Sequence, residues 1–164
     1  MTSRSDAGAR RFWPQRSPRE NPIPRGHFDA VVVGGGFTGL VAALLLARDD
    51  ADVLLCEARA MGAGASGATT AKTTLLQGTR LSDLTGRLGS ATAAQYLTAS
   101  RWGQGWVRDF CSQHGVPVER TTAYTVALTD DGVAPVEAEH AAAQSLGLPT
   151  ALHESLDVPF PVRA

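Results

Sequence analysis

The sequence predicts an α/β fold that starts with a β-α-β unit, and three adjacent segments predict it. Residues 30–33 (AVVV) form an uninterrupted apolar, mostly β-branched run that ends at three glycines. Such a run is typical of a strand buried on both faces in a parallel sheet. Residues 37–50 are rich in helix formers, and residues 52–58 (DVLLCEA) form a second short apolar run. A strand, a helix and a second strand in this order predict one parallel β-α-β unit.

The helix of this unit is marked by the periodicity of its apolar residues. Leu40, Ala43, Leu44 and Ala47 recur at the i, i+3, i+4, i+7 spacing of one helical face. Three aspartates follow at the point where the helix is expected to end. The segment therefore predicts a helix that packs one apolar face on the sheet.

Mostly helical material follows the unit, and it is predicted to begin an α+β domain. Leucines at a three-to-four spacing mark a helix that starts near Leu81, and a stripe of regularly spaced residues marks a second, longer helix that stops at a glycine and a proline. Residues 124–129 (YTVALT) predict a strand, residues 134–147 a helix, and residues 150–154 a last short strand. The stripe of the longer helix consists of Tyr96, Ser100, Gly103, Val107 and Phe110.

The composition limits the classes of partner. The chain has 164 residues, 43% of them apolar, and a formal net charge of -1, as expected of one ordinary globular domain. Six arginines and several prolines fall within residues 1–27, which predicts a disordered arm. We expect no nucleic-acid partner, and no apolar run reaches the length of about 18 residues that a membrane span needs. Cys56 and Cys111 form no metal-ligand pattern, so no metal is predicted and the cytoplasm is the expected location.

The chemistry is concentrated in the turn between the first strand and the helix. Gly34, Gly36 and Gly39 form a G-x-G-x-x-G motif directly after the strand. In such a motif the first glycine permits the tight turn, the second lets backbone N–H groups approach a pyrophosphate, and the third allows the helix to pack closely on the strand. The phosphates meet unpaired N–H groups and the positive end of the helix dipole. The motif therefore predicts dinucleotide binding.

An acidic residue stands where the ribose of a dinucleotide would lie. Glu57 follows Gly39 by 18 residues, at the end of the second strand, and a carboxylate there can accept both hydroxyls of an adenosine ribose. The same carboxylate would repel a 2′-phosphate, which disfavours NADP. The turn alone does not separate FAD from NAD, and a glycine-rich turn that only packs is the alternative.

The segment after Glu57 separates the two cofactors. Residues 58–72 (ARAMGAGASGATTAK) resemble the loop that follows the first β-α-β unit in the amino-acid and amine oxidase family of FAD-dependent oxidoreductases, the D-amino-acid oxidase or glycine oxidase-like group. With the LLQG sequence that comes next, the loop is most similar to a subgroup often fused to a Rieske iron–sulfur domain. The resemblance implies a Rossmann-like FAD-binding fold. It also implies oxidation of a small-molecule amine or amino acid by hydride transfer to FAD, with an unknown electron acceptor.

The resemblance further implies which residues bind the cofactor. The glycine turn would line the pyrophosphate, Glu57 would hold the adenosine ribose with Arg59 at its border, and the loop would pass from the phosphates toward the flavin. Lys72, the only lysine of the chain, would lie near the flavin and stabilise the negative charge of its reduced form; a solvated loop lysine is an equally good interpretation. The implied cofactor-binding residues are Gly34, Gly36, Phe37, Thr38, Gly39, Glu57, Ala58, Arg59, Ala65, Ser66, Thr70, Ala71 and Lys72.

The family to which the resemblance points has longer chains, whose C-terminal parts complete the FAD-binding domain. We therefore expect an N-terminal portion: residues 1–27 as the arm, residues 28–80 as the FAD-binding β-α-β unit with its cofactor loop, and residues 81–164 as a helical segment and the start of a truncated substrate domain. Such an incomplete fold leaves apolar sheet surface uncovered. We expect this portion to bind FAD weakly or not at all and to be inactive alone, and its catalytic residues are unknown.

Two other functions stay open, and other side chains give weaker signals. The chain could be a truncated, non-catalytic nucleotide-binding remnant, or a small NAD-dependent reductase, although it lacks a further β-α-β unit for the latter. Trp102 and Trp106 lie one helical turn apart and are predicted to pack in the core rather than to form an aromatic substrate box. The four histidines show no ligand spacing, and Ser66 lacks the strand context of a hydrolase nucleophile.

Overall fold

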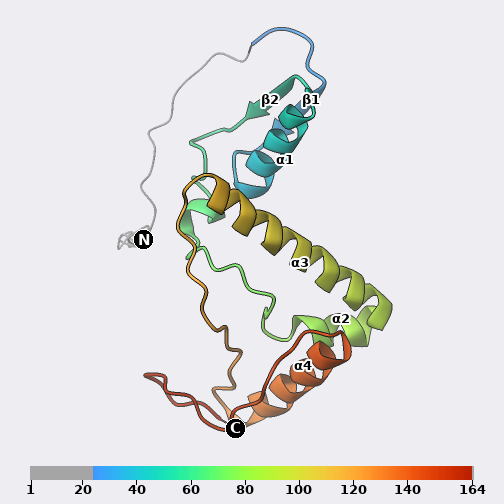
Figure 1. Ribbon diagram of the computed structural model, residues 1–164, viewed down its shortest axis with the longest axis vertical. Helices are drawn as coiled ribbons and strands as arrows, with labels where there is room; N and C mark the ends of the chain where they lie inside the picture. Colours follow the sequence, from blue (N-terminus) through green and yellow to red (C-terminus); the bar gives the residue numbers. More distant parts are fainter. Residues whose placement is uncertain (1–23, 164) are drawn as a thin grey trace, which may run out of the picture. The chain divides into compact units, whose positions relative to one another are not determined.

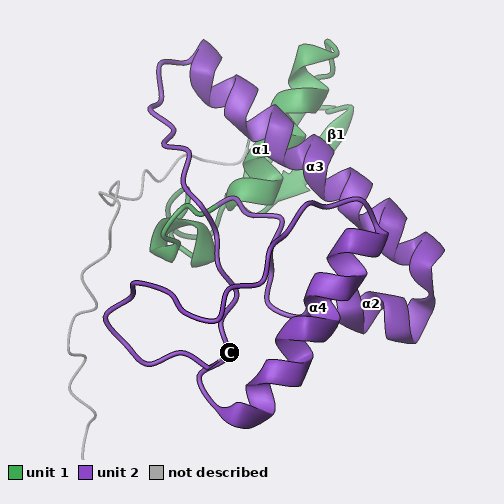
Figure 2. Cartoon of the chain, turned by 60° about the horizontal axis from the view of Figure 1, so that its bottom comes forward, with its two compact units in different colours: residues 1–72 green, residues 73–164 purple. Residues whose placement is uncertain are grey.

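The structure is a computed structural model in which residues 24–163 are described, so most of the predicted arm, residues 1–27, lies outside the described residues (Figure 1). The chain divides into two compact units, residues 1–72 and residues 73–164, which Figure 2 shows in different colours. Unit 1 contains the glycine turn, and unit 2 is largely helical.

Unit 1 is the predicted β-α-β unit. Strand β1 (Ala30–Val33), helix α1 (Phe37–Arg48) and strand β2 (Val53–Cys56) follow one another along the chain. The two strands pair in parallel, with Ala30 opposite Val53, and α1 packs against both of them. Figure 1 shows the helix beside the two strands. The order and type of these three elements are confirmed.

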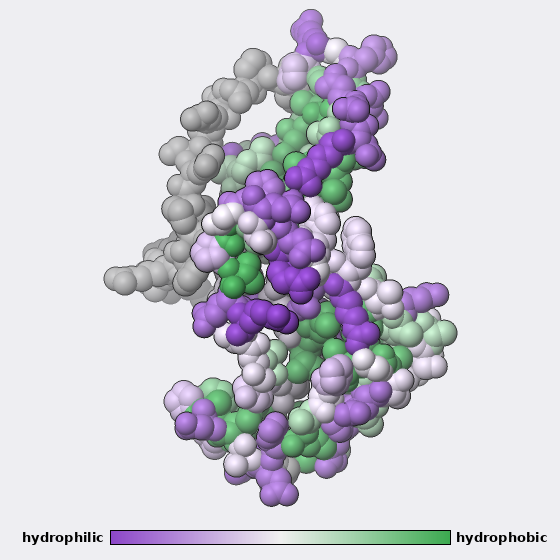
Figure 3. Space-filling model, viewed as in Figure 1, coloured by the Kyte–Doolittle hydropathy of each residue, from purple (hydrophilic) through white to green (hydrophobic). Residues whose placement is uncertain are grey.

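One face of this sheet differs from the prediction. A Cβ built on Gly39 of α1 would lie 3.4 Å from Cγ1 of Val32, so the Val32 side chain faces the helix. Val31 and Val33 face the other way and are 57% and 84% exposed. The prediction that β1 is buried on both faces is wrong for this chain, because α1 covers one face and the described residues leave the other open. In Figure 3, apolar side chains (green) reach the surface over these elements.

Unit 2 consists of three helices and irregular segments. Helix α2 (Arg80–Leu88) leads through Gly89 into the long helix α3 (Ser90–Gln113), and α4 (Val133–Ser145) follows a short 3₁₀ turn. The helices predicted near Leu81, along the stripe of α3 and around residues 134–147 are all present. Helix α2 packs against both α3 and α4, and Figure 2 shows the three helices within one unit.

Most buried side chains of unit 2 come from its three helices and the turn after α4, and Ala127 is buried in the irregular segment before α4. Leu81, Leu97, Ala143 and Leu148 form one cluster. The predicted stripe of α3 lies on the partly buried face of that helix, which agrees with its spacing. Trp102 does not join the core: its side chain is 71% exposed, so its predicted core packing is wrong.

Two predicted strands are not formed. In residues 124–129 the only sheet-like contact among the described residues is an isolated antiparallel bridge between Ala127 and Arg163, where Arg163 N–H donates to the Ala127 carbonyl at 2.9 Å. Residues 150–154 run without regular structure. An alternating apolar pattern becomes a strand only when a neighbouring strand takes its backbone hydrogen bonds, and the described residues offer no such neighbour.

Candidate cofactor site

Three of the glycines at the β1–α1 turn are required by the fold, each for its own reason. Gly34 has φ of 109°, a conformation that side-chain-bearing residues rarely adopt. At Gly39 an added Cβ would run into the backbone carbonyl oxygen of Gly34, so only a glycine lets α1 start this close to β1. Gly35 is buried, and its added Cβ would lie 3.0 Å from Cβ of Glu57. These three positions need glycine for backbone conformation or for packing.

Gly36 is the position where the fold does not require glycine. Its backbone is extended, with φ of −78° and ψ of 178°, which any residue can adopt. An added Cβ would meet only Ser66 Oγ, at 3.4 Å, an ordinary contact distance. Gly36 is the N-cap of α1, so the missing side chain leaves an open approach to the first N–H groups of a helix. A phosphate needs such an approach, and the turn fits the pyrophosphate of a dinucleotide.

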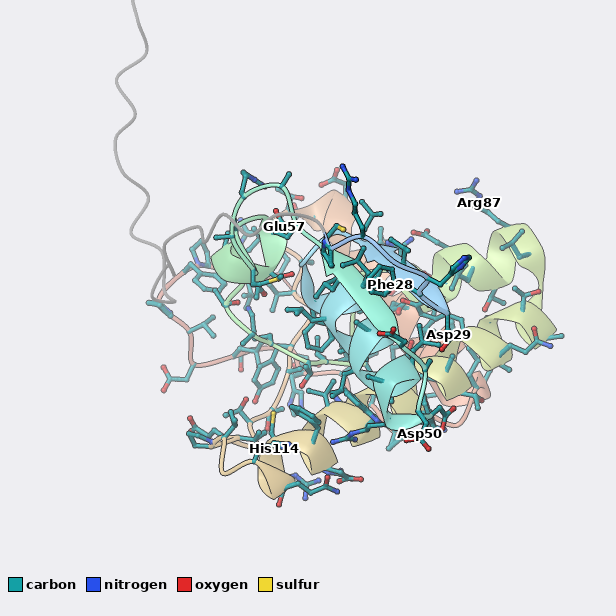
Figure 4. All side chains as sticks on the ribbon, turned by 90° about the horizontal axis from the view of Figure 1, so that it is seen from above. Phe28, Asp29, Asp50, Glu57, Arg87 and His114 are labelled. Atoms are coloured by element: carbon teal, nitrogen blue, oxygen red, sulfur yellow. The ribbon has the colours of Figure 1, made fainter. Side chains whose placement is uncertain are left out.

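Glu57 is held against this turn by two backbone N–H groups. Gly35 N–H donates to Oε2 at 2.7 Å, and Arg59 N–H donates to Oε1 at 2.9 Å. The N–H of Gly35, and after it that of Arg59, lowers the pKa of Glu57 from its ordinary value, because both donors favour the charged form. In Figure 4, Glu57 lies at one end of the paired strands and Asp29 at the other.

The carboxylate of Glu57 keeps acceptor capacity after these two bonds. A carboxylate offers about four lone-pair sites, so ribose hydroxyls can still be accepted at the exposed edge of the group. The side chain therefore fits the predicted ribose role and, in addition, fixes the glycine turn.

The loop after β2 returns to the glycine turn and contacts it at two points. Gly62 N–H donates to the Gly35 carbonyl at 2.8 Å. Further on, a short 3₁₀ helix (Ala65–Ala68) presents Ser66, whose Oγ accepts the N–H of Phe37 at 2.8 Å. The structure thus brings two predicted segments, the first turn of α1 and the Ser66 loop, into direct contact.

The last predicted residues are not drawn into this cluster. Thr70, Ala71 and Lys72 are exposed, and in the described part of the chain no hydrogen bond joins Lys72 to the glycine turn. Ala71 has φ of 57°, unusual for a residue with a side chain, and its N–H donates to Thr69 Oγ1 at 3.2 Å. The segment therefore has a defined bend but no contact that identifies a ligand.

The remaining predicted residues lie along the same elements. Thr38 follows Phe37 in the first turn of α1, and Ala58 follows Glu57 after β2. Arg59 is exposed, with one guanidinium nitrogen 3.7 Å from the position of a Cβ on Gly64.

Sequence reasoning missed Gly35, which the motif treats as a free position. Its buried backbone contacts Glu57 through the N–H and Gly62 through the carbonyl. The only sequence signal for this role is the run of three consecutive glycines, because the motif specifies glycine at just two of these three positions.

Sequence reasoning also missed Glu139 in unit 2. This glutamate of α4 is 3% exposed, and its two oxygens accept the N–H groups of Leu81 at 3.0 Å and Ser82 at 2.7 Å. These donors belong to the first turn of α2, whose N-cap Thr79 makes no side-chain capping bond. A carboxylate from a distant helix therefore caps α2, which no local pattern encodes.

Unit 2 has a cavity of its own, of about 100 Å³, lined in part by Tyr124, His140 and Thr150. His140 Nδ1 and Thr150 Oγ1 lie 2.8 Å apart and form a hydrogen bond.

Among residues 24–163 no group of His, Cys, Asp or Glu side chains could hold a metal ion. No helix of the described part is long and apolar enough to cross a membrane.

Comparisons with known proteins agree with the chemistry of the glycine turn. The sequence profile of the family described as "FAD dependent oxidoreductase" matches residues 29–158. The "Putative Rieske 2Fe-2S iron-sulfur protein YhfW" of Bacillus subtilis (strain 168) is 26% identical over 134 residues, which cover 80% of this chain and 26% of that protein. No solved structure gives a significant match.

Two further relatives match shorter stretches. The "Probable oxidoreductase OrdL" of Rhizobium meliloti (strain 1021) is 32% identical over 91 residues, 56% of this chain and 21% of that protein. The "Amine oxidase [flavin-containing] A" of Canis lupus familiaris is 57% identical over 42 residues, 25% of this chain and 8% of that protein. The matched regions thus span about a quarter of the YhfW protein's length and less of the other two.

Proposed function

The chain belongs to the FAD-dependent oxidoreductase family and its cofactor is FAD; from this premise we propose that it forms the FAD-binding part of an enzyme that oxidises amines or amino acids. When bound, FAD supplies the acceptor for a hydride from a C–H bond next to nitrogen. The relative named as a flavin-containing amine oxidase supports the nitrogen-containing substrate class. Residues 28–80 would carry the cofactor site, residues 81–164 would begin a substrate domain, and the cytoplasm would be the location.

The observation that carries this proposal is the unfilled position at Gly36. Neither its backbone conformation nor any packed neighbour asks for glycine, whereas a pyrophosphate does. The first N–H groups of α1 would bind the phosphates, with Phe37 and Thr38 closest. Glu57 would accept the adenosine ribose, and Ala58 and Arg59 would border it.

The loop and the segment after it would extend the site toward the flavin. Ala65 and Ser66 would lie on the phosphate side, because Ser66 already contacts α1. Thr70, Ala71 and Lys72 would lie closer to the flavin ring. We assign no catalytic acid or base among the described residues, and the electron acceptor stays open.

The cofactor site is tested by titrating the purified chain with FAD and following the flavin fluorescence. We expect FAD to bind weakly and ADP to displace it, since both carry the adenosine and phosphates that the turn would hold. Gly36→Ala should weaken binding roughly ten-fold by filling the phosphate approach, with an unchanged far-UV circular dichroism spectrum. Gly103→Ala, the same change in α3 where an added Cβ meets nothing within 4 Å, is the matched control. Equal FAD affinity of the Gly36→Ala and Gly103→Ala variants would contradict the site, and tighter binding of NAD than FAD would favour the small reductase.

The substrate class is tested on the longest polypeptide that the gene encodes. Under anaerobic conditions, secondary amines or amino acids should bleach the flavin absorbance, and the matching alcohols and 2-hydroxy acids should not. Bleaching by the hydroxy compounds alone would contradict the proposal. In the same protein, Lys72→Met should lower the flavin reduction potential while Lys72→Arg keeps it, if the charge near the flavin acts as proposed.

A further inference from the structure

The N-terminus of α1 is capped by a side chain from outside the helix. The first N–H groups of any helix have no partner within it, and Gly36, the N-cap of α1, has no side chain to supply one. Ser66 lies 29 positions away in the sequence, and its Oγ accepts the Phe37 N–H at 2.8 Å. A hydroxyl from the 3₁₀ helix therefore satisfies the N–H of the first helical residue, whereas an N-cap side chain accepts from the second or third.

This hydroxyl stands in the approach that Gly36 leaves open. Among the described residues, the chain neighbours of Gly36 aside, it is the one atom that a Cβ on Gly36 would meet within 4 Å. A phosphate oxygen that used this approach would meet the N–H groups at the start of α1, and the first of them, that of Phe37, is already bound by Ser66. The hydroxyl and the phosphate thus compete for one donor.

The loop does not depend on this hydroxyl alone for its position. Gly62 N–H donates to the Gly35 carbonyl at 2.8 Å, and Gly67, next to Ser66, is buried. Removal of the hydroxyl should therefore leave the loop attached to the glycine turn. The Ser66 bond can break while the surrounding segment stays in place.

We propose that Ser66 is a displaceable cap, a positioning residue that holds the α1 N-terminus in the absence of FAD and gives up the Phe37 N–H to the pyrophosphate. This inference rests on the proposed placement of the pyrophosphate at α1. An anion at a helix N-terminus makes a stronger, charge-assisted bond than a neutral hydroxyl does, so the exchange favours the phosphate. The cap stabilises the empty turn and lowers the affinity for the nucleotide.

The test uses the whole chain, ADP as the probe, and the Ser66→Ala variant. ADP should bind three- to ten-fold more tightly to Ser66→Ala than to the unaltered chain, because binding no longer breaks a hydrogen bond. Without ADP, amide exchange at Phe37 should be faster in Ser66→Ala; saturating ADP should slow it again. Ser66→Thr, which keeps a hydroxyl, should behave as the unaltered chain does. Ser112→Ala, the same deletion on an exposed part of α3, is the control and should change neither measurement.

Several results would overturn the cap. Weaker ADP binding by Ser66→Ala would make Ser66 a phosphate ligand instead, and equal binding or unchanged exchange at Phe37 would remove the competition. Failure of ADP to bind either protein would also overturn it, since the freed donor would then serve no phosphate. Where ADP does bind, Gly36→Ala separates a failure of the cap from a failure of the cofactor site. If Gly36→Ala binds ADP normally, the placement of the pyrophosphate is wrong. If it weakens binding while Ser66→Ala leaves it unchanged, only the cap is wrong.

Discussion

The two units of this chain are ordered by different kinds of contact. Among the described residues of unit 1 only two glycines, Gly35 and Gly67, are buried, and hydrogen bonds between backbone groups and the side chains of Glu57 and Ser66 hold the turn. Unit 2 instead buries three leucines and one alanine in a single cluster. The described part of unit 1 therefore has an ordered candidate binding site but no buried apolar core. A bound nucleotide should stabilise unit 1 more than unit 2.

The largest effect is expected from a cavity in the core of unit 2. Leu97 is 2% exposed, and Leu97→Ala should lower the free energy of unfolding of this unit by about 2–5 kcal/mol. Leu88→Ala is the matched change at a side chain that is 61% exposed and should cost about 0.5 kcal/mol or less. Urea denaturation followed by circular dichroism measures both. Equal effects of the two variants would show that the cluster does not stabilise unit 2.

The second-largest effect on stability is expected from Glu139 of α4, whose carboxylate caps α2. Glu139→Gln leaves one carbonyl oxygen for two backbone donors and removes the negative charge at the helix N-terminus. It should cost about 1–3 kcal/mol and speed amide exchange at Leu81 and Ser82. Glu137→Gln, at an exposed position of the same helix, should leave both quantities unchanged. If exchange at Leu81 and Ser82 stays slow in Glu139→Gln, the cap is not what holds this turn.

A glycine-to-alanine pair sharpens the comparison, because the two units should respond with opposite sign. Gly35→Ala brings a Cβ onto Sδ of Met61 and to 3.0 Å from Glu57 Cβ. Both side chains must then shift, and the bond of Glu57 to the turn weakens, at a cost of about 1–3 kcal/mol. Gly103→Ala lies in a helix interior with nothing within 4 Å of the added Cβ and should stabilise unit 2 by about 0.5–1 kcal/mol. Amide exchange resolved by residue assigns each effect to its unit. Destabilisation of unit 2 by Gly103→Ala, or no effect of Gly35→Ala, would contradict the comparison.

The smallest effect is a pH dependence confined to unit 1. The N–H of Gly35 keeps the pKa of Glu57 below its ordinary value. The resulting stabilisation is complete above the unfolded-state pKa of about 4.3 and is lost as the pH falls through the lower folded-state pKa. Amide exchange at Gly35, after correction for its intrinsic pH dependence, should become faster over that acidic range. Glu57→Gln should abolish this change, and its persistence in the Glu57→Gln variant would assign the effect to another group.

The local sequence pattern predicted those helices and strands whose formation depends mainly on their own residues. The β-branched run, the helix formers of α1 and the leucine spacing of α2 predicted their elements correctly, because these signals lie within a short window. The apolar stripe predicted for α1 is only partly covered, since Leu40 and Ala47 are exposed. Residues 124–129 have the same kind of signal for a strand, yet they make one bridge. Whether a strand forms depends on a partner that can lie anywhere in the sequence, which a window does not contain.

The candidate site was predictable in its position and not in its internal contacts. The motif located Gly34, Gly36 and Gly39, but it could not show that Gly35 is the buried one or that Ser66 reaches Phe37. Glu139 was hidden for a related reason: an isolated glutamate in a helix is usually on the solvated face. Each of these contacts joins residues at least 22 positions apart, so only the folded chain reveals them.

The cap supplied by Glu139 also has a consequence for the order of events during synthesis. Its bond to the Leu81 N–H joins residues 58 positions apart, so α2 leaves the ribosome well before the carboxylate that completes its first turn exists. A short helix without its cap frays at that end. We therefore expect the first turn of α2 to be a late event on the nascent chain. A chaperone that recognises exposed backbone and leucine side chains would meet this segment for as long as translation of α4 is delayed.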